Sequence, residues 1–213
     1  MLSVVIGVGP GLGMSLARRF GRAGDVALLV LDEPSGEQFV AELAEQGTRA
    51  TAFVADLADE QSLRGALREL RAAVGDPDVV VYNASVGIDV GPGEVTKEQV
   101  LDALAVGTLG AVATYQELAP GMRERGSGTF VVTGSGVSLN PWPGTIALTL
   151  DKAALRAFAL AIFRENKSTG VHCGTVTIDG LLRKPGFEPD TVAETFWAFH
   201  TQSEPTAELV HRP

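Results

Sequence analysis

A glycine-rich turn near the start of the chain has residue types and spacing that could bind a phosphate group. Gly7, Gly11 and Gly13 follow directly after a short apolar strand predicted over 4–7, and Leu12 opens a helix predicted over 12–23. Glycines let the backbone approach a pyrophosphate, and a helix N-terminus supplies amide donors and the positive end of its dipole. The strand–turn–helix context strengthens the prediction. The alternative is a tight turn that binds no ligand.

Further polar residues follow the later predicted strands, at the sheet edge where ligands bind in α/β folds. They are Asp56-Leu57 after the third strand, Asn83-Ala84-Ser85 after the fourth, Ser135 after the fifth, and Lys152 early in the following helix. In order and spacing, these segments and the glycine turn resemble the short-chain dehydrogenase/reductase family over nearly the whole chain. The resemblance implies a nicotinamide dinucleotide bound along this edge.

The resemblance also implies a role for each matched residue. The residues implied to bind the dinucleotide are Gly7, Gly11, Leu12, Gly13, Asp56, Leu57, Asn83, Ala84, Ser85 and Lys152. Ser135 is implied to be a catalytic serine that hydrogen-bonds a substrate carbonyl, and Lys152 to hold the nicotinamide ribose and take part in catalysis. The alternatives are a loop serine that caps local backbone and a surface lysine early in a helix.

Two positions depart from the family's catalytic set. Leu148, four residues before the lysine, stands where the family has tyrosine, and Gly107 stands where a long helix usually carries asparagine. The tyrosine is the family's general acid and base, and leucine has no ionisable group to replace it. No shift of register restores it, because the only tyrosines are Tyr82 and Tyr115.

The end of the second predicted strand bears on the choice of dinucleotide. Val30-Leu31-Asp32-Glu33 contains no lysine or arginine to meet a 2′-phosphate, and Asp32 could accept a hydrogen bond from a ribose hydroxyl. We therefore favour NAD over NADP, with both kept open. The alternative for Asp32 is a solvated turn.

Strands and helices alternate along the chain, which predicts one α/β domain over 1–213 with a Rossmann-like, doubly wound parallel sheet of about seven strands. Strands are predicted at 4–7, 26–31, 51–55, 79–82, 129–133, 171–178 and 208–210. Helices are predicted at 12–23, 36–46, 60–74, 97–119, 149–164 and 191–199. Asp59, Thr96 with Gln99, and Asp190 are predicted helix caps, and Pro120 is expected to end the long helix.

Composition narrows the range of partners. The 213 residues are 45% hydrophobic and 20% charged with a net charge of -9, which indicates a globular chain and disfavours nucleic acid or an anionic membrane as a partner. No apolar run reaches membrane-spanning length. One cysteine, Cys173, and an N-terminus without a signal-peptide pattern predict a cytoplasmic protein. The histidines have no metal-ligand spacing, so no metal site is predicted.

Two further features concern the substrate and assembly. Only about 180–189 is available for a substrate lid, which predicts a shortened lid and an open site. The helix predicted over 149–164 is apolar on nearly all faces over 153–163, and small residues fill 107–113 of the long helix. We expect a homodimer or homotetramer that forms through the helices at 97–119 and 150–164.

Three functions remain open at this stage. The favoured one is an NAD(P)-dependent oxidoreductase acting on a small carbonyl or hydroxyl metabolite, with a degenerate catalytic set. The second is a non-redox enzyme on the same scaffold, an isomerase, dehydratase or cyclase, in which Ser135 with Asp179 or Asp151 acts on the substrate. The third is a catalytically inactive dinucleotide-binding protein.

Overall fold

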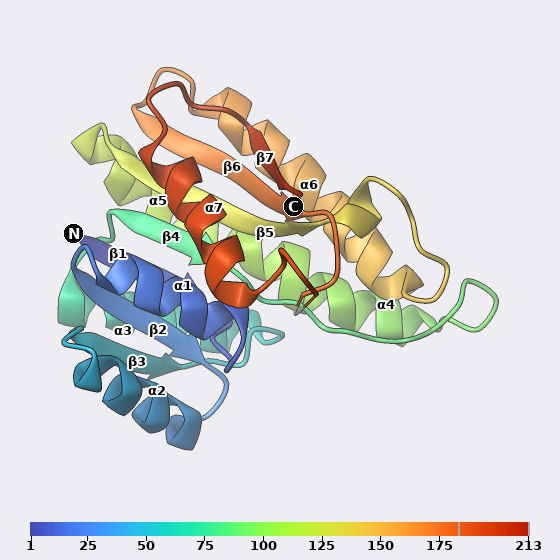
Figure 1. Ribbon diagram of the computed structural model, residues 1–213, viewed down its shortest axis with the longest axis horizontal. Helices are drawn as coiled ribbons and strands as arrows, with labels where there is room; N and C mark the ends of the chain where they lie inside the picture. The colour runs from blue at the N-terminus through green and yellow to red at the C-terminus, as the bar shows by residue number, and fades with distance from the viewer. Residues whose placement is uncertain (183, 213) are drawn as a thin grey trace.

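Seven parallel strands form one sheet at the centre of the fold (Figure 1). The computed structural model describes residues 1–182 and 184–212. The strands are β1 (Leu2–Ile6), β2 (Asp25–Val30), β3 (Ala50–Val54), β4 (Val79–Tyr82), β5 (Gly128–Ser135), β6 (Val171–Ile178) and β7 (Glu208–His211). Their order is β3-β2-β1-β4-β5-β6-β7, so the winding reverses between β1 and β4. The predicted doubly wound α/β fold is confirmed.

Helices cover both faces of the sheet. One face carries α1 (Leu12–Gly21), α2 (Glu33–Glu45) and α7 (Pro189–Thr201), and the other carries α3 (Glu60–Val74), α5 (Gly110–Arg125) and α6 (Ile146–Glu165). The strands between them are therefore buried on both sides: all of β4 and all of β6 is buried. Within the described residues, no helix is long and apolar enough to cross a membrane.

The long helix that leads into α5 continues through Pro120, so the predicted stop there is wrong. It comprises α4 (Lys97–Leu104), a π-helical turn η1 (Ala105–Leu109) and α5, which ends at Arg125. Proline inside a helix costs about 3 kcal/mol. Leu118, Ala119 and Met122, which flank it, are fully buried against the sheet. Burying such side chains stabilises by about 1.5–3 kcal/mol for each large one, which offsets the proline.

Helix caps explain several element boundaries. Asp59 accepts hydrogen bonds from two backbone amides at the start of α3, and Thr96 with Gln99 forms a capping box at α4, as predicted. The helix predicted from residue 36 begins three residues earlier, because the Asp32 carboxylate accepts from the backbone N–H of Ser35 at 2.9 Å and caps α2.

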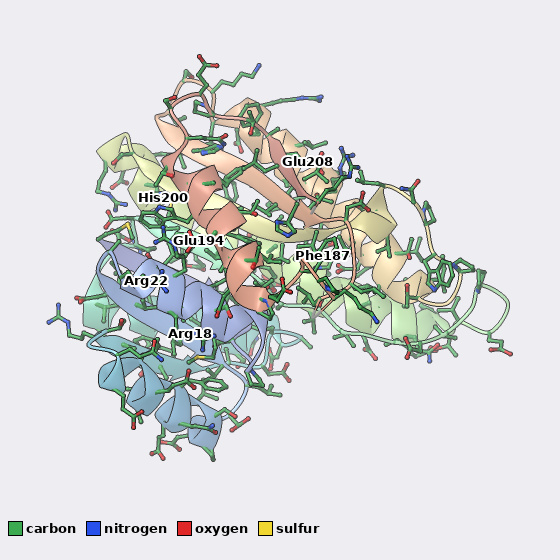
Figure 2. The ribbon with its side chains drawn as sticks, viewed as in Figure 1. Arg18, Arg22, Phe187, Glu194, His200 and Glu208 are labelled. Carbon is green, nitrogen blue, oxygen red and sulfur yellow. The ribbon has the colours of Figure 1, made fainter. Side chains whose placement is uncertain are left out.

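The predicted cap at Asp190 is wrong, because this side chain pairs across to α1. Its Oδ1 lies 3.1 Å from Arg18 Nη2, and Arg19 Nε donates to Glu194 at 2.7 Å, so α1 and α7 are joined along their exposed edges (Figure 2). The N-cap of α7 is Glu188, whose side chain makes no capping hydrogen bond. Proline at the next position pre-sets the first turn instead.

Candidate functional site

The four glycines of the N-terminal turn divide into two pairs with different roles. Gly7 has a φ of +77°, and a Cβ there would lie 2.7 Å from Ala84 Cα; a Cβ on Gly13 would lie 2.8 Å from Val8 Cα. These two positions need glycine so that the turn, β4 and α1 can approach one another. A Cβ on Gly9 or Gly11 would meet nothing within 4 Å. Their backbone is therefore open to a ligand.

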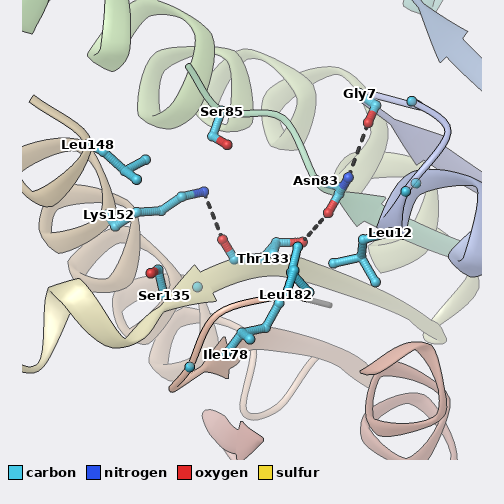
Figure 3. A pocket seen from close by; sticks show the side chains of 15 residues that line it. Gly7, Leu12, Asn83, Ser85, Thr133, Ser135, Leu148, Lys152, Ile178 and Leu182 are labelled. Carbon is cyan, nitrogen blue, oxygen red and sulfur yellow. Dashed lines mark hydrogen bonds between the residues drawn. The ribbon is translucent and has the colours of Figure 1, made fainter. Parts of the chain in front are cut away.

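A cavity of about 340 Å³ lies between this turn and the ends of β4, β5 and β6 (Figure 3). We call it the first cavity. It brings together eight of the predicted site residues: Gly7, Gly11, Leu12, Gly13, Asn83, Ser85, Ser135 and Lys152. Ile178, Gly180 and Leu182 close its far side. The last two belong to the predicted short lid, of which residue 183 lies outside the described residues.

A second cavity of about 370 Å³ adjoins the first on the other side of the turn. The predicted residues that line it are Gly7, Asp56, Leu57, Asn83, Ala84 and Ser85. Gly7, Gly9, Asn83 and Ser85 line both cavities, so the two are halves of one elongated groove along the carboxyl edge. Asp32 is not among the residues described as lining either cavity, since its carboxylate caps α2.

Gly9 and Thr133 are among the lining residues that were not predicted from the sequence. Gly9 lies between the two cavities, and the glycine run itself was the signal for it. Thr133 ends the strand predicted over 129–133, and its position at the carboxyl edge was the available signal. Its Oγ1 donates to Asn83 Oδ1 at 3.0 Å, while Asn83 Nδ2 donates to the Gly7 carbonyl at 3.1 Å. These bonds fix the ends of β1, β4 and β5 relative to one another.

Lys152 is buried, so the alternative of a surface lysine is wrong. Its side chain reaches from α6 into the first cavity, where Nζ donates to the Thr133 carbonyl at 2.9 Å (Figure 3). Ser135 also lines this cavity. Its Oγ accepts a long 3.5 Å hydrogen bond from Val137 N at the start of a short 3₁₀ turn, η2 (Gly136–Ser138), so the serine caps local backbone as well.

Neither tyrosine lines the first cavity within the described part of the chain, whereas Leu148 does. The Tyr82 hydroxyl is buried beneath the long helix and donates to the Val106 carbonyl, and burial raises its pKa above the ordinary value. The side chain of Tyr115, on α5, packs against α6, and burial there raises its pKa to about 12. It donates to Glu165 at 2.8 Å.

The π turn η1 is occupied by a carboxylate from α6. A Cβ on Gly107 would overlap the Asp151 carboxyl group. Asp151 Oδ1 accepts from the backbone N–H and the hydroxyl of Thr108, both at 2.8 Å. The residue is 1% exposed, and its Oδ2 has no hydrogen-bond partner among the described residues. Because residue 107 has no side chain, the Asp151 carboxylate can pack against the helix at this position.

A family model described as short chain dehydrogenase matches residues 2–182. The chain belongs to this family. The probable oxidoreductase EphD of Mycobacterium tuberculosis is 29% identical over 174 residues, which cover 81% of this chain and 29% of that protein. Human short-chain dehydrogenase/reductase 3 is 28% identical over 203 residues, covering 94% and 61%. The chain therefore spans less than two thirds of either curated relative.

Solved structures of short-chain dehydrogenases have the same fold. A metagenomic short-chain oxidoreductase, solved in complex with NADP, superposes with a TM-score of 0.90 at 24% identity and covers 100% of this chain and 97% of its own. A structure from Rhodopseudomonas palustris gives 0.89 at 25% identity, with 100% and 98% covered. These likenesses place the order of strands and helices within the short-chain dehydrogenase fold.

Proposed function

We propose that this short-chain dehydrogenase binds a nicotinamide dinucleotide in its two cavities and is an oxidoreductase. The observation that carries the proposal is the elongated groove formed by both cavities, with the open backbone of Gly9 between them. An adenosine would lie beside Asp56 and Leu57, and a nicotinamide beside Ser135 and Lys152. When bound, the dinucleotide supplies or accepts a hydride, and the chain holds it against the substrate.

The substrate end of the groove supports a small, largely apolar carbonyl or hydroxyl compound. Leu148, Ile178 and Leu182 line the first cavity around the polar groups of Ser135 and Lys152. Apolar walls with a few polar groups are typical of sites for small metabolites. Ser135 would hydrogen-bond the substrate oxygen, and the leucines would exclude water from its carbon skeleton.

The second cavity supports NAD rather than NADP. No lysine or arginine is among the described residues that line it. A 2′-phosphate normally pairs with a cation at the end of β2, where the chain offers Leu31, which lines the cavity, and the adjacent carboxylate of Asp32. The preference rests on this lack of a cation, because the hydrogen bonds of Asp32 are already used to cap α2.

Titration of the purified chain with NADH and NADPH tests the proposal. We expect NADH to bind and to stabilise the fold by about 2.7 kcal/mol at a hundredfold excess over Kd. NADPH should bind more weakly. Calorimetry and thermal melting measure both effects. If neither nucleotide binds at millimolar concentration, the proposed oxidoreductase function is excluded.

A dinucleotide-binding protein without turnover is the second candidate, and Leu148 is the observation that favours it. Loss of a positioned general acid reduces rates by about 10²- to 10⁴-fold.

The position of Asp179 does not support a non-redox enzyme in which this residue acts on the substrate. Its carboxylate accepts from Arg212 Nε at 2.8 Å, and it is not among the described residues that line the first cavity.

We also propose that the chain forms a homodimer or homotetramer through the long helix and α6. A groove between α5 and α6 is lined partly by Val112, Phe158 and Ala161. On the same helices, Leu109 is 59% exposed and Leu150 is 44% exposed. Exposed leucines beside an apolar groove are typical of surfaces that are covered in an assembly.

Leu109→Glu is expected to dissociate such an assembly without unfolding the chain, because this leucine is mostly exposed and a charge there would be buried at the interface. Sedimentation velocity should show oligomers for the parent chain and monomers for the variant. Val54→Glu, which places the same charge on an exposed apolar residue of β3 away from these helices, is the matched control. A parent chain that sediments as a monomer would contradict the proposed interface.

A further inference from the structure

Lys152 is the one ionisable side chain among the described residues that line the first cavity. The other side chains there are amides, hydroxyls and hydrocarbons. In Figure 3, the lysine side chain extends into the cavity, with Leu148 beside it on the same helix. Any proton that the described lining exchanges with a bound substrate near neutral pH must therefore come from this amino group, because serine and threonine hydroxyls do not ionise in that range.

The surroundings of the amino group suit proton exchange. Lys152 is 4% exposed, and its one acceptor in the described structure is the Thr133 carbonyl. An ammonium has three N–H groups, so two are left for a ligand. Burial lowers the pKa of Lys152 below the ordinary lysine value, while the charge of Asp151 opposes this shift. Leu148, which lies beside Lys152 in the first cavity, is a hydrocarbon and cannot solvate the amino group as a polar side chain would.

Asp151 is the charged group that acts on Lys152. Burial raises the pKa of Asp151, and the positive charge of Lys152 together with the hydrogen bonds from Thr108 lowers it. The segments β5, η1 and η2, which pack against α6, contain no ionisable residue. In β6, His172 and Cys173 lie at the start of the strand, at the opposite end from the site.

Tyr82 of β4 lies near Asp151 but stays neutral, because burial and the Asp151 charge raise its pKa. Tyr115 of α5 and Glu208 of β7 bond to other positions on α6.

The charged residues of α4, which also packs against α6, are too well solvated to compete. Lys97, Glu98 and Asp102 of α4 are exposed. A buried carboxylate and a buried ammonium that are adjacent in sequence stabilise each other's charge. The free Oδ2 of Asp151 has no other partner in the described structure to share that charge.

We propose that Lys152 itself donates the proton to the substrate oxygen, and that Asp151 is the positioning residue that keeps this lysine charged between turnovers. The proposal rests on the oxidoreductase function argued above. In the reductive direction, a dihydronicotinamide supplies one hydride to the carbonyl carbon and is oxidised. The carbonyl π bond breaks, a Lys152 N–H bond breaks, and an O–H bond forms. After the product leaves, the neutral amine takes a proton from water that enters the open cavity, and the hydroxide formed passes to the solvent.

The replacement of tyrosine by leucine then has two connected effects. Leucine at 148 removes one proton donor from the site, and its hydrocarbon side chain helps to desolvate the lysine, which makes the lysine a better donor. A lysine that only held a ribose would need its charge and its length but would not need to lose a proton. The two roles can be separated by experiment.

The first test follows the titration of Lys152 without any dinucleotide. The chain has four lysines, Lys97, Lys152, Lys167 and Lys184, so NMR of protein labelled with ¹³C at lysine Cε resolves them, and Lys152→Met assigns the signal. We expect Lys152 to titrate at lower pH than the other three. Asp151→Asn should lower it further, because the opposing charge is lost. Titration of Lys152 together with the others would overturn the proposal.

The second test compares Lys152→Arg with Lys152→Met in single-turnover reduction of aliphatic aldehydes by NADH. Arginine keeps the positive charge but does not deprotonate in proteins. If the lysine is the proton donor, both variants should lose about 10²-fold or more in rate. The parent rate should fall as pH rises through the pKa found by NMR, and Asp151→Asn should move that fall to lower pH.

Calorimetry with NADH separates this proposal from the proposed function. An arginine variant that binds NADH and reduces aldehydes at the parent rate would overturn the proton-donor role alone. A parent chain that binds no dinucleotide would overturn both proposals. If Lys152→Met does not fold, the arginine variant and the NMR titration of the parent and Asp151→Asn still decide the question.

Discussion

Gly9→Asp is expected to weaken NADH binding by about 100-fold and to leave the stability of the free protein unchanged. Gly9 lies between the two cavities, where the pyrophosphate of a bound dinucleotide would cross the turn. A carboxylate about 5 Å from a phosphate charge costs about 3 kcal/mol at an effective dielectric constant of about 20. Folding should tolerate the change, because a Cβ at this position meets nothing within 4 Å. Calorimetry and thermal melting measure the two effects separately.

Two controls establish that charge is the cause. Gly9→Ala adds a methyl group in the same open space and should retain most of the affinity. Gly65→Asp places the same charge in α3, where a Cβ also meets nothing within 4 Å, away from both cavities. The loss in Gly9→Asp should shrink at high salt, because ions screen exposed charges. Equal affinity of the aspartate variant and the parent chain would show that the dinucleotide does not cross this turn.

Gly7 provides the contrasting case within the same motif. It combines a positive φ with a close approach to Ala84, so a side chain there would disturb folding before it affected a ligand. The sequence motif shows that these positions are glycine but does not show which of them pack against the protein and which face open space. That distinction depends on the approach of β4 to the turn, which brings together residues more than seventy positions apart.

The sheet could be predicted because continuous apolar runs and glycine stops are local signals, and β6 was predicted with its observed bounds. The boundaries that were wrong depend on contacts across the chain. Asp190 has the residue type of a helix cap, but Arg18 of α1 competes for its carboxylate. Pro120 has the residue type of a helix stop, but burial of its neighbours keeps the helix intact. The local preference of a residue does not decide the structure where tertiary contacts contribute more free energy.

The candidate site shows the same division between local signal and tertiary contact. Residues that follow strands in the sequence were correctly predicted to meet at the carboxyl edge, since parallel topology brings strand ends together. Asp32 also follows a strand, yet its carboxylate bonds to Ser35 three residues later. The burial of Lys152 and the position of Asp151 over Gly107 depend on how α6 packs against the π turn, and no spacing in the sequence encodes that contact.

The last prediction concerns this contact: Gly107→Ala should destabilise the protein by about 3 kcal/mol. On helix propensity alone, alanine would stabilise the helix by about 1 kcal/mol. Here the added methyl group would overlap the Asp151 carboxylate. Overpacking costs about 1–3 kcal/mol, and displacing the carboxylate would also leave the half-buried Thr108 N–H without its acceptor, at about 1 kcal/mol more. Urea denaturation measures the change in the free energy of unfolding.

The double variant Gly107→Ala, Asp151→Ala distinguishes this cause from a general effect on the helix. Removing the carboxylate empties the space that the new methyl group needs, so the double variant should be more stable than the sum of the two single changes predicts, by at least about 1 kcal/mol. Purely additive changes would show that the two positions do not compete for space. Strong coupling would mean that a side chain at 107 requires a small residue at 151. The glycine at 107, where the family usually has asparagine, and the buried aspartate at 151 would then be two parts of one change in packing.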